Sequence, residues 1–551
     1  MKMNTKKFLL LTVAFLTGTL SLFAQSNERG IDLYNAELYD AAKLFFERQT
    51  NQTPQLQAEN YYYLGQTYFE LGDMTQAASY YKKAQETDSS YPFGYIGEGR
   101  IALKNGNKKE AETLFKKASG LAKKNPAVET AIAENYIDAG MDKEMEDALK
   151  KAEKYNKKYP GIAVVRGNKF EREGNMGEAG RWYENAILFD PTNKEAYLKF
   201  ARGYKNLNRS LALQKLDELL AIDPNYIPAY AYIGDINYQL GNYKSAIEAY
   251  EKFISIPGVP IEQKKNYAQL LYFTDQYQES LNQIQQVLKE DPNDVIMLRL
   301  QAYNYYKLED YNKGLQAMNS FLSKADPKML IYLDYTTLAR LHLGNKEYSE
   351  ALAAYQKAET IEGANLGEIY REMTTAYEGL GDYPNAIVYY EKYFNAEGTT
   401  PVSTDYFFYG SACYAEATNY FNQDNEAEMM KYVEKGDKAF EEVTERSPDS
   451  YLGYFWRARI NSLVDSRQQK LTDKMDGLAK PYYEKAIEIM EANNANGARN
   501  KDLIEAYYYL GSYYIMNKNN DLAGEYFKKI LSIDPAQERA QSILKSLGIK
   551  Y

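Results

Sequence analysis

The chain of 551 residues has very little cysteine and histidine: Cys413 and His342 are the only ones. A single cysteine cannot form an internal disulfide, so an oxidising compartment would add no covalent stabilisation to the fold. One cysteine and one histidine also exclude metal sites built from several such residues. Glycine-rich phosphate loops in a strand–loop–helix context are absent as well. We therefore expect no enzyme, no cofactor and no metal site.

Long apolar runs are scarce too, and the one that exists, residues 8–24, follows three lysines at the N-terminus. A basic start, a short apolar stretch and a polar continuation from Gln25 are typical of a secretory signal peptide. We expect residues 1–24 to be that signal, cleaved after Ala24. Leu22 occupies a position that usually holds a small residue, so an uncleaved anchor stays open as the alternative.

The chain has fewer basic residues than acidic ones, 66 against 76. The formal net charge is −10, and it becomes −13 without residues 1–24, which hold three lysines and no acid. Such a surface disfavours nucleic acid and anionic membranes. After signal cleavage we expect no integral membrane segment. The Phe23-Ala24-Gln25 boundary and the 55 tyrosines look like those of Gram-negative envelope proteins, which favours a periplasmic or secreted protein, associated with the outer membrane through partners.

What the chain does contain is a repeat. One ladder of glycines is spaced at 34 residues, and a second ladder of small residues runs seven residues ahead of it: Gly72, Gly106, Gly140 and Gly174; Gly65, Gly99, Ala133 and Gly167. A fixed period of this size means one supersecondary unit, copied along the chain, that buries its apolar face only against its neighbours. In the clearest copy, spacings of three and four place Tyr61, Leu64, Gly65 and Tyr68 on one stripe of a helix.

The second half of that copy reads Ala77-x3-Tyr81-x2-Ala84, another helical stripe. The whole unit resembles the tetratricopeptide repeat, a helix–turn–helix with an aromatic-x2-Leu-Gly-x2-Tyr signature followed by Ala-x3-aromatic. The resemblance covers about residues 28 to 535. It implies an all-α fold, an α-α superhelix (a right-handed solenoid) of about 14 tetratricopeptide-like helix pairs. His342 and Cys413 then fall on packed faces of first helices, as core or interface residues.

The repeats change character along the chain. We expect a regular array over residues 25–397 and irregular repeats over 398–535, with longer helices or inserted loops at Asn419–Lys431, at Asp465–Lys480 and at Asn493–Gly497. These insertions are tolerated surface additions or, alternatively, elaborations specific to a partner. The amphipathic end, residues 536–551, is expected to form a capping helix on the last repeat. The loop at 396–401 is a candidate hinge.

In tetratricopeptide proteins the first helix of each pair lines the concave surface. Carried onto this chain, the resemblance implies a strip of aromatic and cationic residues that faces a bound peptide: Tyr62, Phe69, Arg100, Arg202, Lys205, Tyr238, Lys265, Tyr272, Arg299, Tyr303, Tyr306, Arg340 and Arg371. Tyrosine and arginine are enriched at interaction hot spots. The competing interpretation is that the tyrosines continue the core between repeats.

The function that these observations favour is a non-enzymatic scaffold that binds protein or peptide segments in the bacterial cell envelope, for assembly or transport of envelope components. It would associate there with an envelope complex. Two alternatives stay open: a glycan or small-ligand binder that uses tyrosines as stacking platforms, and a structural component that associates with copies of itself.

Overall fold

The computed structural model describes residues 26–49, 52–472, 474–492, 494 and 497–550. Across these residues the regular structure consists of 29 α-helices and one 3-10 helix (Pro327–Met329), with no strand. The helices form 14 successive pairs, followed by a single helix, α30. The prediction of an all-α solenoid of about 14 helix pairs is confirmed. The predicted signal peptide lies outside the described residues.

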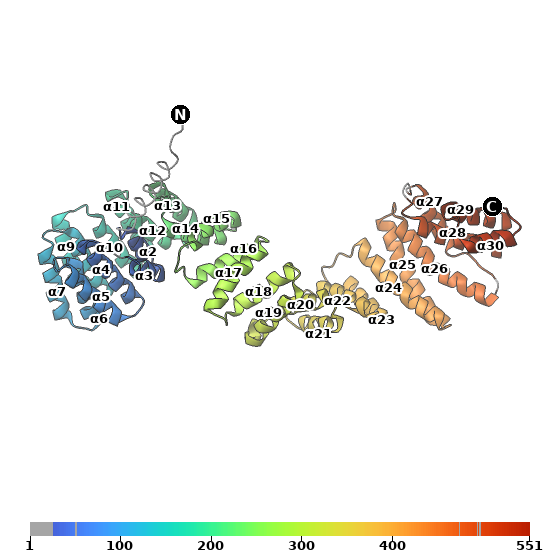
Figure 1. The fold of residues 1–551 in the computed structure, drawn as a ribbon, viewed down its shortest axis with the longest axis horizontal. Coiled ribbons are helices and arrows are strands. Elements are labelled where there is room, and N and C mark those ends of the chain that lie inside the picture. The colour runs from blue at the N-terminus through green and yellow to red at the C-terminus, as the bar shows by residue number, and fades with distance from the viewer. Residues whose placement is uncertain (1–25, 50–51, 473, 493, 495–496, 551) are drawn as a thin grey trace, which may run out of the picture. The chain divides into compact units, whose positions relative to one another are not determined.

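The chain divides into two compact units between Leu300 and Gln301. We call the even-numbered helix of each pair its first helix and the odd-numbered one its second helix (Figure 1). The first unit contains α2 (Glu28–Asn35), α3 (Tyr39–Glu47), α4 (Pro54–Glu70), α5 (Met74–Thr87), α6 (Pro92–Lys104), α7 (Lys108–Leu121), α8 (Pro126–Asp138), α9 (Asp142–Tyr155), α10 (Pro160–Arg172), α11 (Met176–Phe189), α12 (Lys194–Tyr204), α13 (Arg209–Ile222), α14 (Ile227–Gln239), α15 (Tyr243–Ile254), α16 (Ile261–Phe273) and α17 (Tyr277–Glu290).

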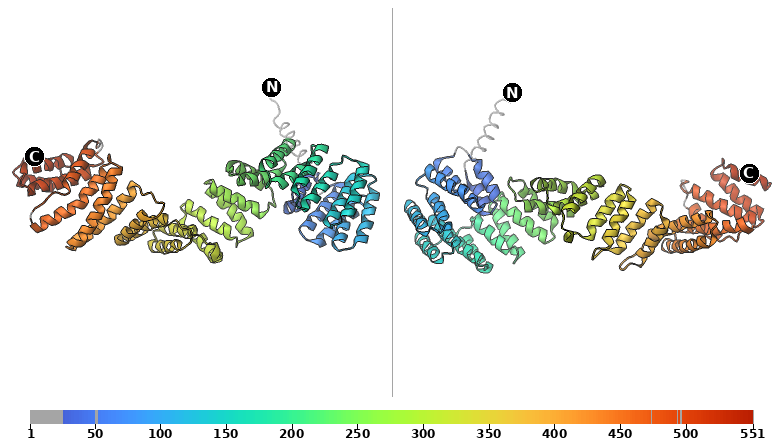
Figure 2. Two further views of the ribbon diagram at one scale, coloured as in Figure 1. Left: turned by 180° about the vertical axis from the view of Figure 1, so that it is seen from behind. Right: turned by 90° about the horizontal axis from the view of Figure 1, so that it is seen from below.

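Helix α18 (Val295–Lys307) contains the division between the units. The second unit continues with α19 (Tyr311–Lys324), α20 (Tyr332–Gly344), α21 (Tyr348–Glu359), α22 (Leu366–Leu380), α23 (Tyr383–Asn395), α24 (Ser403–Asn422), α25 (Glu426–Arg446), α26 (Tyr451–Thr472), α27 (Lys480–Ala492), α28 (Asn500–Met516), α29 (Asn520–Ile533) and α30 (Glu538–Ser546). Within each unit, neighbouring pairs stack side by side (Figure 2).

The ladder that begins at Gly72 marks the turn inside each pair. Gly72 has a φ of +85°, and a Cβ at that position would meet no atom within 4 Å, so backbone conformation alone favours glycine. Asp73 then begins the next helix, because its side chain accepts the N–H of Gln76 at 3.0 Å. Where later repeats lack the glycine, another residue adopts the same conformation, such as Lys346 with a φ of +61°.

The second ladder makes room for an aromatic ring. A Cβ on Gly65 would lie 2.5 Å from the ring of Tyr81, which is fully buried between the helices of its pair. Gly167 and Tyr183 repeat this contact. The small residue of the first helix and the aromatic residue of the second are therefore one packing unit, repeated along the chain.

The irregular repeats have longer helices. Helices α24, α25 and α26 are 20, 21 and 22 residues long, so most of the predicted extra sequence extends helices instead of forming loops. The segment after α26 is tied down by Asp465, whose carboxylate accepts the N–H groups of Gly477, Leu478 and Ala479 at 2.9 Å. Of the expected insertion at 493–497, residues 493 and 495–496 lie outside the described residues. Helix α30 packs Ala540 and Leu544 against the final pair.

Candidate functional site

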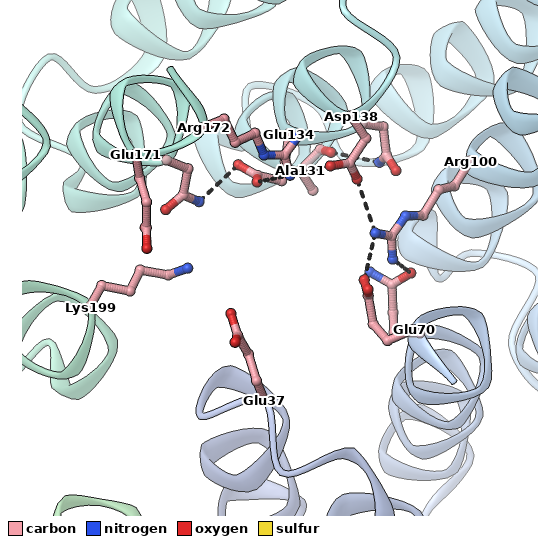
Figure 3. A network of polar contacts seen from close by, with 12 residues as sticks. Glu37, Glu70, Arg100, Ala131, Glu134, Asp138, Glu171, Arg172 and Lys199 are labelled. Carbon is pink, nitrogen blue, oxygen red and sulfur yellow. Dashed lines mark hydrogen bonds and ion pairs between the residues drawn. The ribbon is translucent and has the colours of Figure 1, made fainter. Parts of the chain in front are cut away.

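The first helices of the first unit surround a cavity. Helices α2, α4, α6, α8, α10 and α12 all contribute residues to its wall, and its volume is about 640 Å³. Helix α2 contacts both α4 and α12, so the series of first helices returns to its starting point. The concave surfaces of these repeats therefore face one shared, partly enclosed cavity. Figure 3 shows polar side chains around it.

Closure of this ring depends on contacts between residues more than 160 positions apart. The Lys194 ammonium on α12 lies 2.7 Å from Asp32 and 2.9 Å from Glu28, both on the N-terminal side of the ring. Apolar residues of α2 and α3, among them Leu33, share one core with residues of α12 to α15. Gly258 approaches so closely that its Cβ would lie 2.7 Å from the backbone of Ala41.

Arg100 is the centre of the charged network inside the ring. Its side chain is 9% exposed, and its guanidinium donates to Glu70 at 2.6 Å and to Asp138 at 2.9 Å (Figure 3). The same group lies over the ring of Phe69, 3.9 Å from its centroid. A guanidinium bonded to two carboxylates and stacked on an aromatic face is held firmly. Arg100 thereby joins three consecutive first helices.

Of the acidic residues labelled in Figure 3, Glu134 has the longest ion pair, 3.4 Å to Arg172. It accepts Asn168 Nδ2 at 3.1 Å, and its cationic neighbour Arg172 is 3.4 Å away and also pairs with Asp138. Burial, opposed by Lys199 and reinforced by the charge of Asp138, raises the pKa of Glu134 above its ordinary value. Glu134 is therefore held by longer polar contacts than its acidic neighbours, and it lines the cavity.

One wall of the cavity is aromatic. The rings of Tyr39, Tyr34, Tyr63, Tyr62 and Phe93 follow one another with centroid separations of 5.1 to 5.7 Å. Burial raises the pKa of Tyr62 to about 12, so its hydroxyl is neutral at physiological pH. The cavity thus combines an aromatic wall with a charged one.

Of the residues predicted for the concave strip, Tyr62 and Arg100 line this cavity. Phe69 packs against the guanidinium of Arg100, and Arg202 lies beside the cavity. Arg202 pairs with Glu37 of α2 and lies 2.8 Å from Glu171 of α10. Lys205 lines a smaller hollow of about 200 Å³ with Tyr232 and Asp235. The other predicted residues of the first unit lie outside the cavity: Tyr238, Lys265, Tyr272 and Arg299. Lys265 is bound to Asp294 at 2.6 Å.

The predicted strip residues of the second unit connect neighbouring repeats. Tyr303 donates to Asp334 at 2.7 Å, 31 residues further along the chain. Arg340 binds Glu372 at 2.7 Å, and its guanidinium is 6.0 Å from the ring of Tyr306. Arg371 continues the series through its own ion pair with the next repeat. At least one donor group of each of Tyr303, Arg340 and Arg371 is thus already used within the chain.

The sequence prediction omitted Glu134, although its position carried a signal. It follows Ala133 of the small-residue ladder, as Gln66, Arg100 and Asn168 follow Gly65, Gly99 and Gly167. Residues in this register meet one period apart: Arg100 donates to Gln66 at 3.2 Å and Asn168 donates to Glu134, each pair separated by 34 residues. Glu37 and Lys199 could not be found this way, because ring closure places them at the cavity.

The two rare residues are in the second unit. Cys413 is fully buried, and burial raises the pKa of its thiol to about 12, so it is a packed side chain and not a nucleophile. His342 is partly buried, with Nδ1 2.6 Å from a carboxylate oxygen of Glu347. No helix within the described ranges combines the length and apolar character that crossing a membrane requires.

Comparison with known proteins gives three matches to the family model of the tetratricopeptide repeat, at residues 58–91, 227–258 and 504–537. Each match spans one helix pair: α4 with α5, α14 with α15, and α28 with α29. The signal recognition particle subunit SRP72 of Dictyostelium discoideum is 33% identical over 113 residues, which is 20% of this chain and 16% of that protein. The TPR repeat-containing protein YpiA of Bacillus subtilis is 25% identical over 191 residues, 33% of this chain and 44% of that protein.

The chain thus spans less than half the length of these two relatives. Among solved structures, the C-terminal part of a TPR repeat-containing protein of Cytophaga hutchinsonii is 28% identical. That match covers 50% of this chain and 98% of the other, with a TM-score of 0.40.

Proposed function

Because this chain is a tetratricopeptide-repeat protein, we propose that it is a non-enzymatic scaffold that binds segments of partner proteins through the concave surfaces of its repeats. Tetratricopeptide repeats generally mediate protein–protein interaction. The observation that carries the proposal is the cavity of the first unit, where six first helices bring aromatic and charged side chains to one partly enclosed surface. Such surfaces combine hot-spot residue types with partial enclosure.

The proposed setting is the bacterial cell envelope, in the periplasm or secreted, where the protein would serve assembly or transport of envelope components. Support comes from the three N-terminal lysines, the apolar run up to Ala24 and the acidic mature chain. Fractionation of cells followed by intact mass measurement tests this setting. A mature protein that begins at Gln25 in the soluble envelope fraction is the expected result, and a full-length chain in the cytosol would contradict it.

Partner binding is best tested by site-specific photo-crosslinking in cells. A photoreactive residue replaces Tyr39 or Ala131, which line the cavity, or Leu188, which is 73% exposed on second helix α11. We expect the two cavity positions to crosslink to the same protein and Leu188 to give a different pattern or none. Identical patterns from all three positions, or no crosslink from the cavity, would count against a concave binding surface.

Crosslinking is preferable to reversing the charges of Arg340 and Arg371. Their guanidinium groups bind Glu372 and Asp405 of the following repeats at 2.7 and 2.8 Å. Reversal would place two like charges together and destabilise the array itself. Loss of a partner from such a variant would therefore not report on the binding surface.

A further inference from the structure

The wall of the cavity in the first unit carries more negative than positive charge. Six acidic and three basic residues line it: Glu37, Glu70, Glu134, Asp138, Asp190 and Glu195; Arg100, Arg172 and Lys199. Arg202 and Glu171 form an ion pair beside the cavity, and their opposite charges cancel. The excess of three acidic residues is therefore unchanged. The potential inside a partly enclosed cavity follows the excess charge of its wall, so this cavity attracts cations and repels anions.

The positive groups at the cavity are already engaged with its carboxylates. Arg100 is shared by Glu70 and Asp138, and Arg172 pairs with Asp138 as well. Lys199 lies 3.7 Å from Glu195, and its ammonium reaches into the space between the helices (Figure 3). Glu134 and Glu37 lie on opposite sides of that space. The cavity therefore already holds one ammonium group on a flexible side chain, that of Lys199. The Glu134 carboxylate, with its long ion pair, can accept a further hydrogen bond.

The volume of the cavity and its aromatic wall restrict further which ligands it can bind. Because helices α2 and α3 close the ring, a long helix cannot lie in this part of the concave surface as it could in an open groove. A volume of about 640 Å³ is within the range of small-ligand sites, roughly 300–1,000 Å³. Tyr34, Tyr62 and Tyr63 line the cavity, and aromatic rings attract organic cations.

We propose that the cavity of the first unit binds a small organic cation, a primary ammonium or guanidinium on a flexible stem, with Glu134 as its principal carboxylate. This goes beyond the scaffold function, since the group can belong to a free amine or to a lysine or arginine side chain of a partner. The acceptor is the Glu134 carboxylate, and the rings of the aromatic wall cover the stem.

Isothermal titration of the purified chain at about 50 mM salt tests the proposal, because low salt preserves charge attraction. Two probes separate the sources: cadaverine, and the capped peptide acetyl-Gly-Lys-Gly-amide, with its Nε-acetylated form as the neutral control. Binding of cadaverine assigns the site to free amines as well, whereas binding of the peptide alone assigns it to partner side chains. The acetylated peptide is expected not to bind.

Three variants locate the binding. Glu134→Gln is expected to weaken it about tenfold or more, because a charge-assisted hydrogen bond is lost. Glu184→Gln removes the same charge from the outer face of α11 and should change affinity less than about twofold. Lys199→Met removes the competing ammonium and should tighten binding several-fold, a gain that misfolding cannot produce.

The proposal is overturned if neither probe binds the wild type. It is equally overturned if Glu134→Gln and Lys199→Met change affinity no more than Glu184→Gln does. Protein crosslinks from the cavity positions alongside failed titrations would refute the cation site and leave the scaffold function standing.

Discussion

Arg371 and Asp405 form an ion pair across one repeat, 34 residues apart, with Nε 2.8 Å from Oδ1. Asp405 is 4% exposed, and its other oxygen accepts the backbone N–H of Val402 at 2.9 Å and the hydroxyl of Tyr393 at 3.1 Å. One carboxylate therefore begins helix α24 and ties it to the preceding repeat. Asp334 does the same for α20 through Ile331 and Tyr303.

Loss of the Arg371–Asp405 ion pair should destabilise the packing of α22 and α24 locally. We expect Arg371→Ala to destabilise the α22–α24 junction by about 1 kcal/mol, because the buried Asp405 loses a charged partner while the arginine itself is half exposed. Hydrogen exchange of α24 should accelerate accordingly. Arg181→Ala, which breaks an exposed pair within α11, is the control and should leave exchange unchanged. Equal hydrogen exchange of α24 in both variants would show that the Arg371–Asp405 ion pair adds no stability to this junction.

Ring closure predicts different costs for two glycine substitutions. Gly258 and Gly72 both have positive φ, +78° and +85°, but only at Gly258 would a Cβ meet backbone, that of Ala41 at 2.7 Å. We expect Gly72→Ala to cost about 1 kcal/mol for conformation alone. Gly258→Ala should cost about 2–4 kcal/mol, since the contact between α3 and the 255–260 loop must open as well.

Hydrogen exchange of α2 and α3 distinguishes the two substitutions. Gly258→Ala should expose these helices to exchange, whereas Gly72→Ala should affect α4 and α5. If both variants leave α2 and α3 equally protected, the contact between α3 and the 255–260 loop is not what holds the ring closed.

The stability of the contact that closes the ring, between Asp32 and Lys194, should depend on pH. Burial raises the pKa of Asp32 to about 6, although Lys194 at 2.7 Å opposes the shift. Because the folded pKa exceeds the unfolded value, the contribution of Asp32 to stability is complete below about pH 4 and is lost as the pH rises through 6. Asp32→Asn has no such titration. Its stability relative to the wild type should therefore rise between pH 4 and 7, by up to roughly 3 kcal/mol, because a tenfold change in proton affinity corresponds to about 1.4 kcal/mol.

Calorimetric unfolding of both chains across this pH range measures that difference. Asp217→Asn, on the exposed side of α13, is the matched control and should show a nearly constant difference. A constant difference for Asp32→Asn as well would mean that its carboxyl is not buried in the closed ring.

Cys413 should be unreactive in the folded chain. Its thiol is buried and its pKa is raised to about 12, so thiolate forms only when the α24–α25 region opens. We expect a disulfide reagent at neutral pH to react at least about a hundredfold faster in denaturant than in buffer. A Ser323→Cys variant, exposed on α19, should add one equivalent that reacts at once. Rapid reaction of the wild type would contradict the packing of α24 on α25.

Much of the fold followed from local pattern. The 34-residue ladders predicted helix pairs, their turns and their number, because each ladder position reports contacts inside one pair or between adjacent pairs. Gly65 against Tyr81 is such a contact, made between helices that are neighbours in the chain. The cysteine was likewise predicted as a packed residue from its place in the repeat. Which extra residues in 398–535 would lengthen helices and which would form loops was not predicted.

The candidate site was only partly predictable. Positions of first helices indicated Tyr62 and Arg100, which line the cavity, but the predicted strip was aromatic and cationic, with its arginines and lysines facing a bound peptide. In the structure, Arg100, Lys265, Arg340 and Arg371 bind carboxylates of neighbouring repeats. A residue's type and register specify that it faces inward. They do not specify which of several inward carboxylates becomes its partner.

The sequence by itself determined the all-helical repeat, its period and the residues that pack within and between adjacent pairs, because those interactions join positions less than about one repeat apart. Only the tertiary structure decided that the first unit closes into a ring, that Lys194 meets Asp32, and that an acidic, tyrosine-lined cavity results. The physical reason is that closure depends on small rotations accumulated over six successive pairs. No local spacing records that sum, and a slight change in each rotation would leave the ring open.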